Sequence, residues 1–277
     1  MFLGPLNNMT TIAATALAFH PNVQVLNHGA RHLWEARGCN FLADFTEENF
    51  QYFCREAIEY SQTSGISGYP GGSIIVSHTF SNNDMVIRYM SRYGPNPVKE
   101  DVQCIVWKDP MELERYTTKN LIHYEKLFRE DGDRLRFLLP IRNPLDTTMS
   151  MSRGDNWKQY EGKTNNLVGD LIDAVIQDIY RFLRLQREFP SRFFFFTQDN
   201  FPHILEDLAE FLDLDFDETW VQTCQEIWQP RPSYRVLPVM LDFYTMMVKM
   251  RFGGFPKVRD MLLEYGKVRE GVEYRDP

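Results

Sequence analysis

The sequence predicts an α/β protein in which a central parallel sheet is flanked by helices on both faces. Apolar runs of strand length alternate along the chain with longer segments of helical periodicity. The run at residues 136–141 is continuous and apolar enough for a strand that is covered on both faces. The 277 residues include 43% hydrophobic and 14% aromatic residues, enough for one substantial core, so we expect a single domain over residues 1–277.

Charge and cysteine content exclude several classes of protein. The formal net charge of −8 argues against general affinity for nucleic acid or anionic membranes, so any anionic ligand must be held by local groups. The four cysteines are widely spaced, with no CxxC pair or nearby histidine cluster, and indicate neither a zinc site nor a disulfide framework. The N-terminal apolar run is too short for a membrane span and has no positive leader. We expect a cytoplasmic protein with no integral membrane segment and no metal; the sequence leaves the oligomeric state open.

The chain begins with a short apolar strand, a turn and a helix. The strand comprises residues 2–3, and the helix over residues 10–19 should open near Asn8 or Met9. The start of such a helix presents unpaired backbone N–H groups and the positive end of a dipole, which suits an anion. The alternative is an ordinary helix that is capped by Asn8 or Thr10 and binds no ligand.

The remaining segments continue the alternation of strands and helices. Strands are expected where β-branched and aromatic residues cluster, and helices where apolar residues recur every three to four positions. The expected strands are residues 23–26, 73–76, 102–107, 136–141 and 192–197. The expected helices are residues 45–61, 83–92, 111–130, 167–189, 203–212, 217–227 and 256–265, with a turn-rich loop at 64–73 and a polar loop at 152–166.

Polar and basic groups follow three of the expected strands directly. They are the loop at residues 7–11, Lys108 and Arg142. In open parallel sheets, ligands bind beyond the carboxyl ends of the strands. We therefore expect these groups to face one site.

Arg142 and Ser150 are candidates for holding a phosphate. Arg142 follows a buried strand, and a helix after it could bring the Ser150 hydroxyl back toward the guanidinium. The planar guanidinium donates two hydrogen bonds to a phosphate, and the hydroxyl donates a third. The alternative is an arginine that pairs with a carboxylate at the sheet edge.

Three segments, in the same order along the chain, resemble motifs of the sulfotransferases that use 3′-phosphoadenosine-5′-phosphosulfate (PAPS). RFLLPIRNPLDTTMSMSRG resembles the family's 3′-phosphate motif, a strand followed by R-[DN]-P-x-D-x-x-x-S. GPLNNMTT resembles the family's G-x-P-[KR]-S-G-T-T loop, and residues 192–217 are similar to a later strand, acidic turn and helix. The matching residues are Gly4, Thr10, Thr11, Arg142, Asn143, Pro144, Asp146 and Ser150.

The resemblance implies a sulfotransferase-like fold, related to that of P-loop NTPases, and transfer of a sulfuryl group from PAPS without a metal. The acceptor would be a hydroxyl or amine of a small-molecule, carbohydrate or lipid partner. Lys108 would stabilise the leaving phosphate. Independently of the resemblance, His78 is the best candidate for the general base, because it follows the expected strand 73–76 next to the Gly-rich loop and a neutral imidazole could take a proton from an acceptor hydroxyl. The residues implied to bind the co-substrate are Asn7, Asn8, Met9, Thr10 and Thr11 at the 5′-phosphosulfate, and Arg142, Ser150 and Arg251 at the 3′-phosphate.

The chain departs from the family pattern at the 5′ loop. Asn7 stands where the family has Lys or Arg, and Lys108 is one possible replacement for that cation. Lys108 could instead be a solvated residue at a helix start, and His78 a structural histidine. The alternative function is a noncatalytic nucleotide-binding or scaffold protein of the same fold that has lost turnover. The motifs G-x-x-x-x-G-K-[ST], G-x-G-x-x-G and HExxH are all absent from the sequence, which disfavours ATP or GTP phosphoryl transfer.

Overall fold

The computed structural model describes residues 1–65, 71–80, 83–94, 98–110, 112–113, 123–160, 167–229, 233–267 and 274–275. Its strands are β1 (Val23–His28), β2 (Gly71–Ser73), β3 (Cys104–Lys108), β4 (Phe137–Ile141), β5 (Phe193–Thr197), β6 (Ser233–Tyr234) and β7 (Tyr274–Arg275). Its α-helices are α1 (Thr10–Ala18), α2 (Glu47–Tyr60), α3 (Asn83–Tyr93), α5 (Tyr124–Glu130), α6 (Pro144–Ser152), α7 (Val168–Glu188), α8 (Leu205–Phe211), α9 (Glu218–Ile227), α10 (Pro238–Arg251) and α11 (Pro256–Tyr265). The short turns of helix are η1 (His32–Ala36), η2 (Ile74–Val76), η3 (His78–Phe80), η4 (Asp155–Tyr160) and η5 (Phe201–His203).

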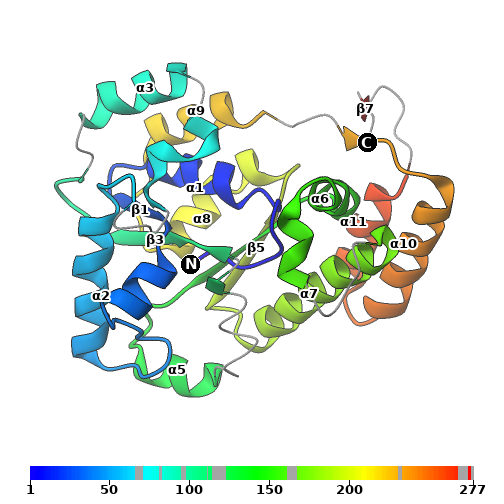
Figure 1. The fold of residues 1–277 in the computed structure, drawn as a ribbon, viewed down its shortest axis with the longest axis horizontal. Helices are drawn as coiled ribbons and strands as arrows, with labels where there is room; N and C mark the ends of the chain where they lie inside the picture. Colours follow the sequence, from blue (N-terminus) through cyan, green and yellow to red (C-terminus); the bar gives the residue numbers. More distant parts are fainter. Residues whose placement is uncertain are drawn as a thin grey trace.

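The strands confirm the predicted parallel pairing. β1 pairs in parallel with β3, and β4 pairs in parallel with β5. β2 adds an antiparallel edge to β1, and β6 and β7 form a separate parallel pair. In Figure 1, α2 lies to the left of the strands and α6, α7, α10 and α11 lie to the right; α2, α7, α10 and α11 contribute to the same core.

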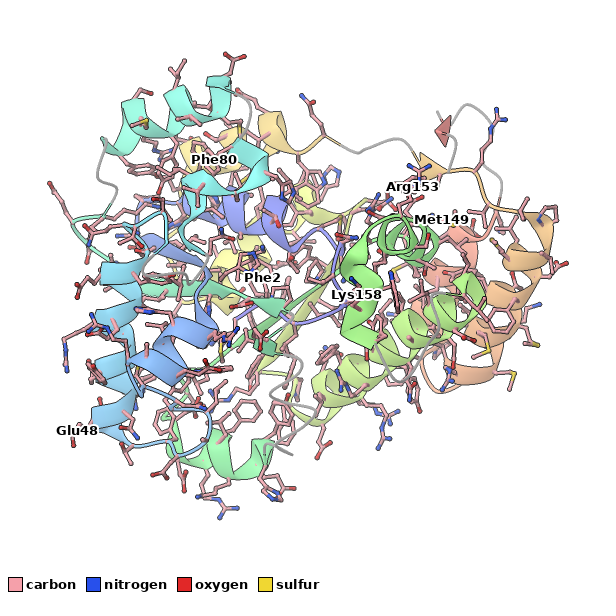
Figure 2. The ribbon with its side chains drawn as sticks, in the orientation of Figure 1. Phe2, Glu48, Phe80, Met149, Arg153 and Lys158 are labelled. Atoms are coloured by element: carbon pink, nitrogen blue, oxygen red, sulfur yellow. The ribbon has the colours of Figure 1, made fainter. Side chains whose placement is uncertain are left out.

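The first three residues join the two larger sheets. Phe2 N donates to Trp107 O on β3 (3.0 Å), and Leu3 N donates to Leu138 O on β4 (2.9 Å). Leu138 N in turn donates to Met1 O (2.8 Å). Figure 2 shows Phe2 near the middle of the molecule, among the strands. The loop that follows residue 3 therefore leaves from the centre of the strand layer.

Apolar side chains pack on both faces of this layer, as the predicted fold class requires. Successive residues of a strand point to opposite faces, so neighbours such as Phe2 and Leu3 contribute to different cores. One core contains Leu3, Leu26, Trp107, Leu139 and Phe193 with residues of α2, α7, α10 and α11. The other contains Phe2, Val25, Val106, Leu138 and Phe196 with residues of α1, α8 and α9. The α/β class with helices on both faces is confirmed.

One predicted strand, residues 73–76, is wrong. The strand β2 comprises Gly71–Ser73, and residues 74–76 form a 3₁₀ turn in which Ile75 N donates to Ser73 Oγ (3.4 Å). Gly71 and Gly72 have φ of 109° and 106°, which favours glycine, and a Cβ on Gly71 would lie 2.5 Å from Asn27 O. Because the glycines approach β1 closely, the residues that pair with β1 are 71–73, which precede the apolar residues 74–76.

Other elements keep their predicted type with shifted ends. β1 continues to His28, two residues beyond the predicted strand 23–26. In place of the predicted helix 111–130, the described residues contain α5 and helical residues 112–113, and residues 114–122 lie outside the description. The predicted loops 64–73 and 152–166 also lie partly outside it, and η4 occupies part of the second. None of the described helices combines the length and apolar character that a bilayer-spanning helix needs.

Candidate functional site

A cavity of about 950 Å³ lies at the carboxyl ends of β1, β3 and β4. It brings together most of the site residues that the sequence predicts. Two predicted residues, Asn8 and Arg251, are not among those that line it. The predicted residues that line it are Asn7, Met9, Thr10, Thr11, His78, Lys108, Arg142 and Ser150.

The loop between residue 3 and α1 wraps one end of this cavity. Its backbone has positive φ at Gly4 (116°), Asn7 (60°) and Met9 (63°). Met9 precedes α1 and makes no side-chain cap, so neither Asn8 nor Thr10 fills the predicted capping role at that position. The first-turn N–H groups of a helix have no intrahelical acceptor, so α1 offers donors at the edge of the cavity.

Asn8 lies beneath the loop and shapes it. Its side chain is fully buried. Its Oδ1 accepts from Arg142 N at 2.9 Å, and its Nδ2 donates to Pro140 O. Asn8 therefore fastens the loop to the end of β4, while its neighbours Asn7 and Met9 face the cavity.

Arg142 and Ser150 face the cavity from the next strand and helix. Arg142 directly follows β4, is only 9% exposed, and donates from Nη1 to Asn7 O at 3.2 Å. Asn143 caps α6 by accepting from Leu145 N at 3.0 Å, and α6 carries Ser150 to the same cavity. Arg142 and Ser150 therefore line the same cavity.

Lys108 is the last residue of β3 and is almost fully buried. Burial lowers the pKa of its ammonium to about 8, and the neighbouring Asp109 carboxylate opposes this shift. Its Nζ lies 2.8 Å from His28 Nε2. Lys108 is thus not the solvated residue at a helix start that was its alternative interpretation.

His28 is a cavity residue that the sequence did not single out. It ends β1 with φ of 59°, and its Nδ1 lies 3.3 Å from Asp109 Oδ1. His28 lies two residues beyond the predicted strand 23–26. The pairing of Asn27 with Lys108 brings the end of β1 beside the end of β3. The sequence signal that could have identified His28 as a site residue is a histidine at the end of one strand together with Lys-Asp at the end of the parallel neighbouring strand.

His78 and Arg251 differ in their relation to the cavity. His78 is exposed on η3 and lines the cavity, although a turn and not a strand end delivers it. Arg251 is the last residue of α10, and its Nη2 lies 2.6 Å from Asp173 Oδ1 on α7. The structure therefore does not bring Arg251 to the cavity that Arg142 faces.

Other residues that line the cavity carry charges of both signs. Asp84 and Arg88 come from α3, and Glu226 comes from α9. Arg88 and Glu226 form an ion pair between the two helices. Trp228 adds an aromatic surface, and its Nε1 donates to Gln198 O at 2.9 Å. The lining thus combines donors and cations with acidic and aromatic groups.

The chain is similar over most of its length to solved sulfotransferases. Sulfotransferase STF9 from Mycobacterium avium has 14% identity and a TM-score of 0.45, with 99% of this chain and 77% of that chain covered. Mouse sulfotransferase SULT7A1, complexed with PAP, has 11% identity and a TM-score of 0.38, with 84% and 94% covered. No family model and no curated protein matches the sequence. Similarity this weak carries no functional conclusion, so function is inferred from the cavity.

Proposed function

We propose that the protein is a sulfotransferase that moves a sulfuryl group from PAPS to a hydroxyl or amine of a small-molecule, carbohydrate or lipid acceptor. One observation carries the proposal: the open end of α1, Lys108 and Arg142 all line the same cavity. The family motifs around Arg142 and in the first loop add sequence support.

The donor set fits a nucleotide that carries phosphate groups. Backbone amides, the hydroxyls of Thr10 and Thr11, an ammonium and a guanidinium are all donors, and two of them are cations. Arg142 and Ser150 would hold the 3′-phosphate. The loop at residues 7–11 would hold the 5′-phosphosulfate.

In the proposed reaction, the acceptor oxygen or nitrogen forms a bond to sulfur as the bond from sulfur to the bridging phosphate oxygen breaks. His78 would take the proton of the acceptor group. Lys108 and the α1 amides would face the negative charge that develops on the leaving phosphate. Lys108 would thus supply the cation that the loop lacks at Asn7.

Calorimetric titration with 3′-phosphoadenosine-5′-phosphate (PAP) tests the nucleotide site. We expect binding by the wild type and a loss of about 10- to 100-fold in Arg142→Ala, the usual value of a charge-assisted hydrogen bond. Arg259→Ala on α11 is the matched control, because Arg259 pairs with Asp260 and does not line the cavity. Absence of binding by the wild type at millimolar PAP would refute the proposal.

A transfer assay separates the enzyme from a noncatalytic nucleotide-binding protein. The wild type is incubated with PAPS that carries a radiolabelled sulfuryl group and with a panel of phenols, sugars, lipids and amines. Labelled product that depends on Lys108 supports the enzyme. PAP binding without transfer to any acceptor would favour the noncatalytic protein.

A further inference from the structure

Asp109, His28 and Lys108 form a chain of polar contacts that ends in the cavity. Asp109 is 3% exposed and accepts from Ala30 N through Oδ2 at 3.0 Å. Its other oxygen lies 3.3 Å from His28 Nδ1. The second ring nitrogen, His28 Nε2, lies 2.8 Å from Lys108 Nζ. His28 and Lys108 both line the cavity.

The carboxylate determines which ring nitrogen of His28 carries the proton. An ionised carboxylate only accepts hydrogen bonds, so the contact with Asp109 requires a hydrogen on His28 Nδ1. In the neutral ring, Nε2 then has only a lone pair and can only accept. The ammonium of Lys108 can only donate, so the two groups match. This series of contacts therefore favours one state, with a negative Asp109, a neutral His28 and a positive Lys108.

Other charged or titratable groups reach the same cavity from the surrounding elements. They are His78 on η3, Asp84 and Arg88 on α3, Arg142 after β4, and Glu226 on α9. Arg88 and Glu226 pair with each other. Asp109 is the charged neighbour that raises the pKa of Lys108 against the effect of burial. The state of Lys108 is thus most directly coupled to the Asp109–His28 pair.

We propose that Asp109 and His28 are positioning residues, which keep Lys108 protonated and direct its ammonium into the cavity. Their part in anion binding rests on the proposed function, whereas their control of Lys108 does not. Neither residue needs to contact the substrate. Asp109 acts on Lys108 through His28 and through its own charge, and His28 acts through Lys108.

Asp109→Asn is the sharpest test of this proposal. The single amide oxygen cannot replace both carboxylate oxygens, which accept from Ala30 N and His28 Nδ1 on separate atoms. If the amide oxygen serves Ala30, its NH₂ faces His28 and forces the other tautomer, so that Nε2–H opposes the Lys108 ammonium. The variant also removes the negative charge. Both effects lower the pKa of Lys108.

Two His28 variants separate hydrogen bonding from packing. His28→Gln keeps an acceptor oxygen for Lys108, whereas His28→Leu fills similar space without one. We expect His28→Leu to lower the pKa of Lys108 and His28→Gln to change it little. If His28 has a purely structural role, the pKa of Lys108 should shift equally in both variants or should not shift in either.

The pKa of Lys108 can be followed without any ligand, through the Cε resonance of lysine labelled with carbon-13. Lys108→Gln assigns the signal, and Lys126 on α5 is the internal control. We expect a midpoint at about 8 in the wild type. In Asp109→Asn the midpoint should fall by about one pH unit or more, as on loss of a neighbouring opposite charge. In His28→Leu it should fall because the Lys108 ammonium loses its hydrogen-bond acceptor. Unchanged midpoints in both folded variants would overturn the proposal.

PAP affinity measured between pH 7 and pH 9.5 tests the link to function. In the wild type, affinity should fall by up to about 10-fold per pH unit above pH 8, because one proton is lost from Lys108. Asp109→Asn should begin this fall at lower pH, whereas Arg142→Ala should weaken binding without moving the profile. A profile that does not move in Asp109→Asn overturns the link. If the wild type does not bind PAP, the proposed function fails, and the resonance titration still decides whether Asp109 and His28 control Lys108.

Discussion

The two ends of α1 differ in how their backbone polar groups are paired. At the C-terminal end, Lys99 Nζ donates to Ala18 O, His20 O and Val23 O at 2.5, 2.5 and 2.6 Å. Trp220 Nε1 adds a hydrogen bond to Ala16 O at 2.8 Å. At the N-terminal end, Met9 provides no side-chain cap, and the loop before it leaves the first turn facing the cavity.

This difference identifies the end of α1 that is suited to a ligand. Buried polar groups of the backbone are nearly always paired, and the C-terminal end follows that rule within the protein. The Lys99 ammonium that pairs with these carbonyls lies where water is excluded, and this burial lowers its pKa to about 7. The N-terminal end instead shares its cavity with Lys108 and Arg142. An anion would complete the pairing at that end.

Asn8→Ala should have the largest effect, because it removes the support of the open end. The change leaves Pro140 O and Arg142 N without their buried partner. We expect the free energy of unfolding to fall by about 3 kcal/mol, since an unsatisfied buried group costs about 1–3 kcal/mol. Urea denaturation measures this loss. PAP affinity should fall as well, because the loop loses its anchor.

Asn7→Gly is the control for Asn8→Ala. It keeps the backbone carbonyl to which Arg142 donates, and glycine suits the φ of 60° at this position. We expect a change in unfolding free energy below about 1 kcal/mol. Equal losses in the two variants would mean that Asn8 has no special part in shaping the loop.

Met9→Asp should have an intermediate effect and act in opposite directions on stability and binding. A carboxylate at the start of α1 interacts well with the helix dipole and should stabilise the protein by up to about 1 kcal/mol. The same charge lies in the cavity wall and should weaken PAP binding by about 10- to 100-fold through repulsion. Met9→Asn is the uncharged control at this left-handed position. Unchanged affinity in Met9→Asp would mean that the open end of α1 does not bind the anion.

The sequence was sufficient for the fold class and for the elements around the cavity. Periodicity and apolar runs predict α1, β3, β4, α7 and β5 close to their observed bounds. The strand at residues 73–76 was wrong because its edge pairing depends on a close approach of Gly71 to β1, which is a tertiary contact. Local patterns do not contain that information.

The candidate site was predictable only where its residues directly follow a strand. Lys108 and Arg142 could be placed because carboxyl ends of parallel strands meet at one edge. The part played by His28 and Asp109 depends on the register of β1 against β3 and on two further residues of β1. The buried position of Asn8 depends on contacts with the end of β4, more than 130 residues away. Neither could be derived from spacing.

Arg251→Ala should have the smallest effect and tests whether the C-terminal side of the molecule belongs to the same site as the open end of α1. Arg251 pairs with Asp173 on α7, and both side chains are about one-third exposed, 30% and 38%. Such a pair contributes about 0–1 kcal/mol to stability, so urea denaturation should show little change. PAP affinity should stay within about 2-fold of the wild type, a difference below about 0.5 kcal/mol, because Arg251 does not line the cavity.

The family resemblance implies the opposite result for Arg251, a contact with the 3′-phosphate. A loss of 10-fold or more, with unfolding unchanged, would support that contact and extend the site beyond the end of α1; an unchanged affinity would leave Arg142 and Ser150 as the groups proposed to hold the 3′-phosphate.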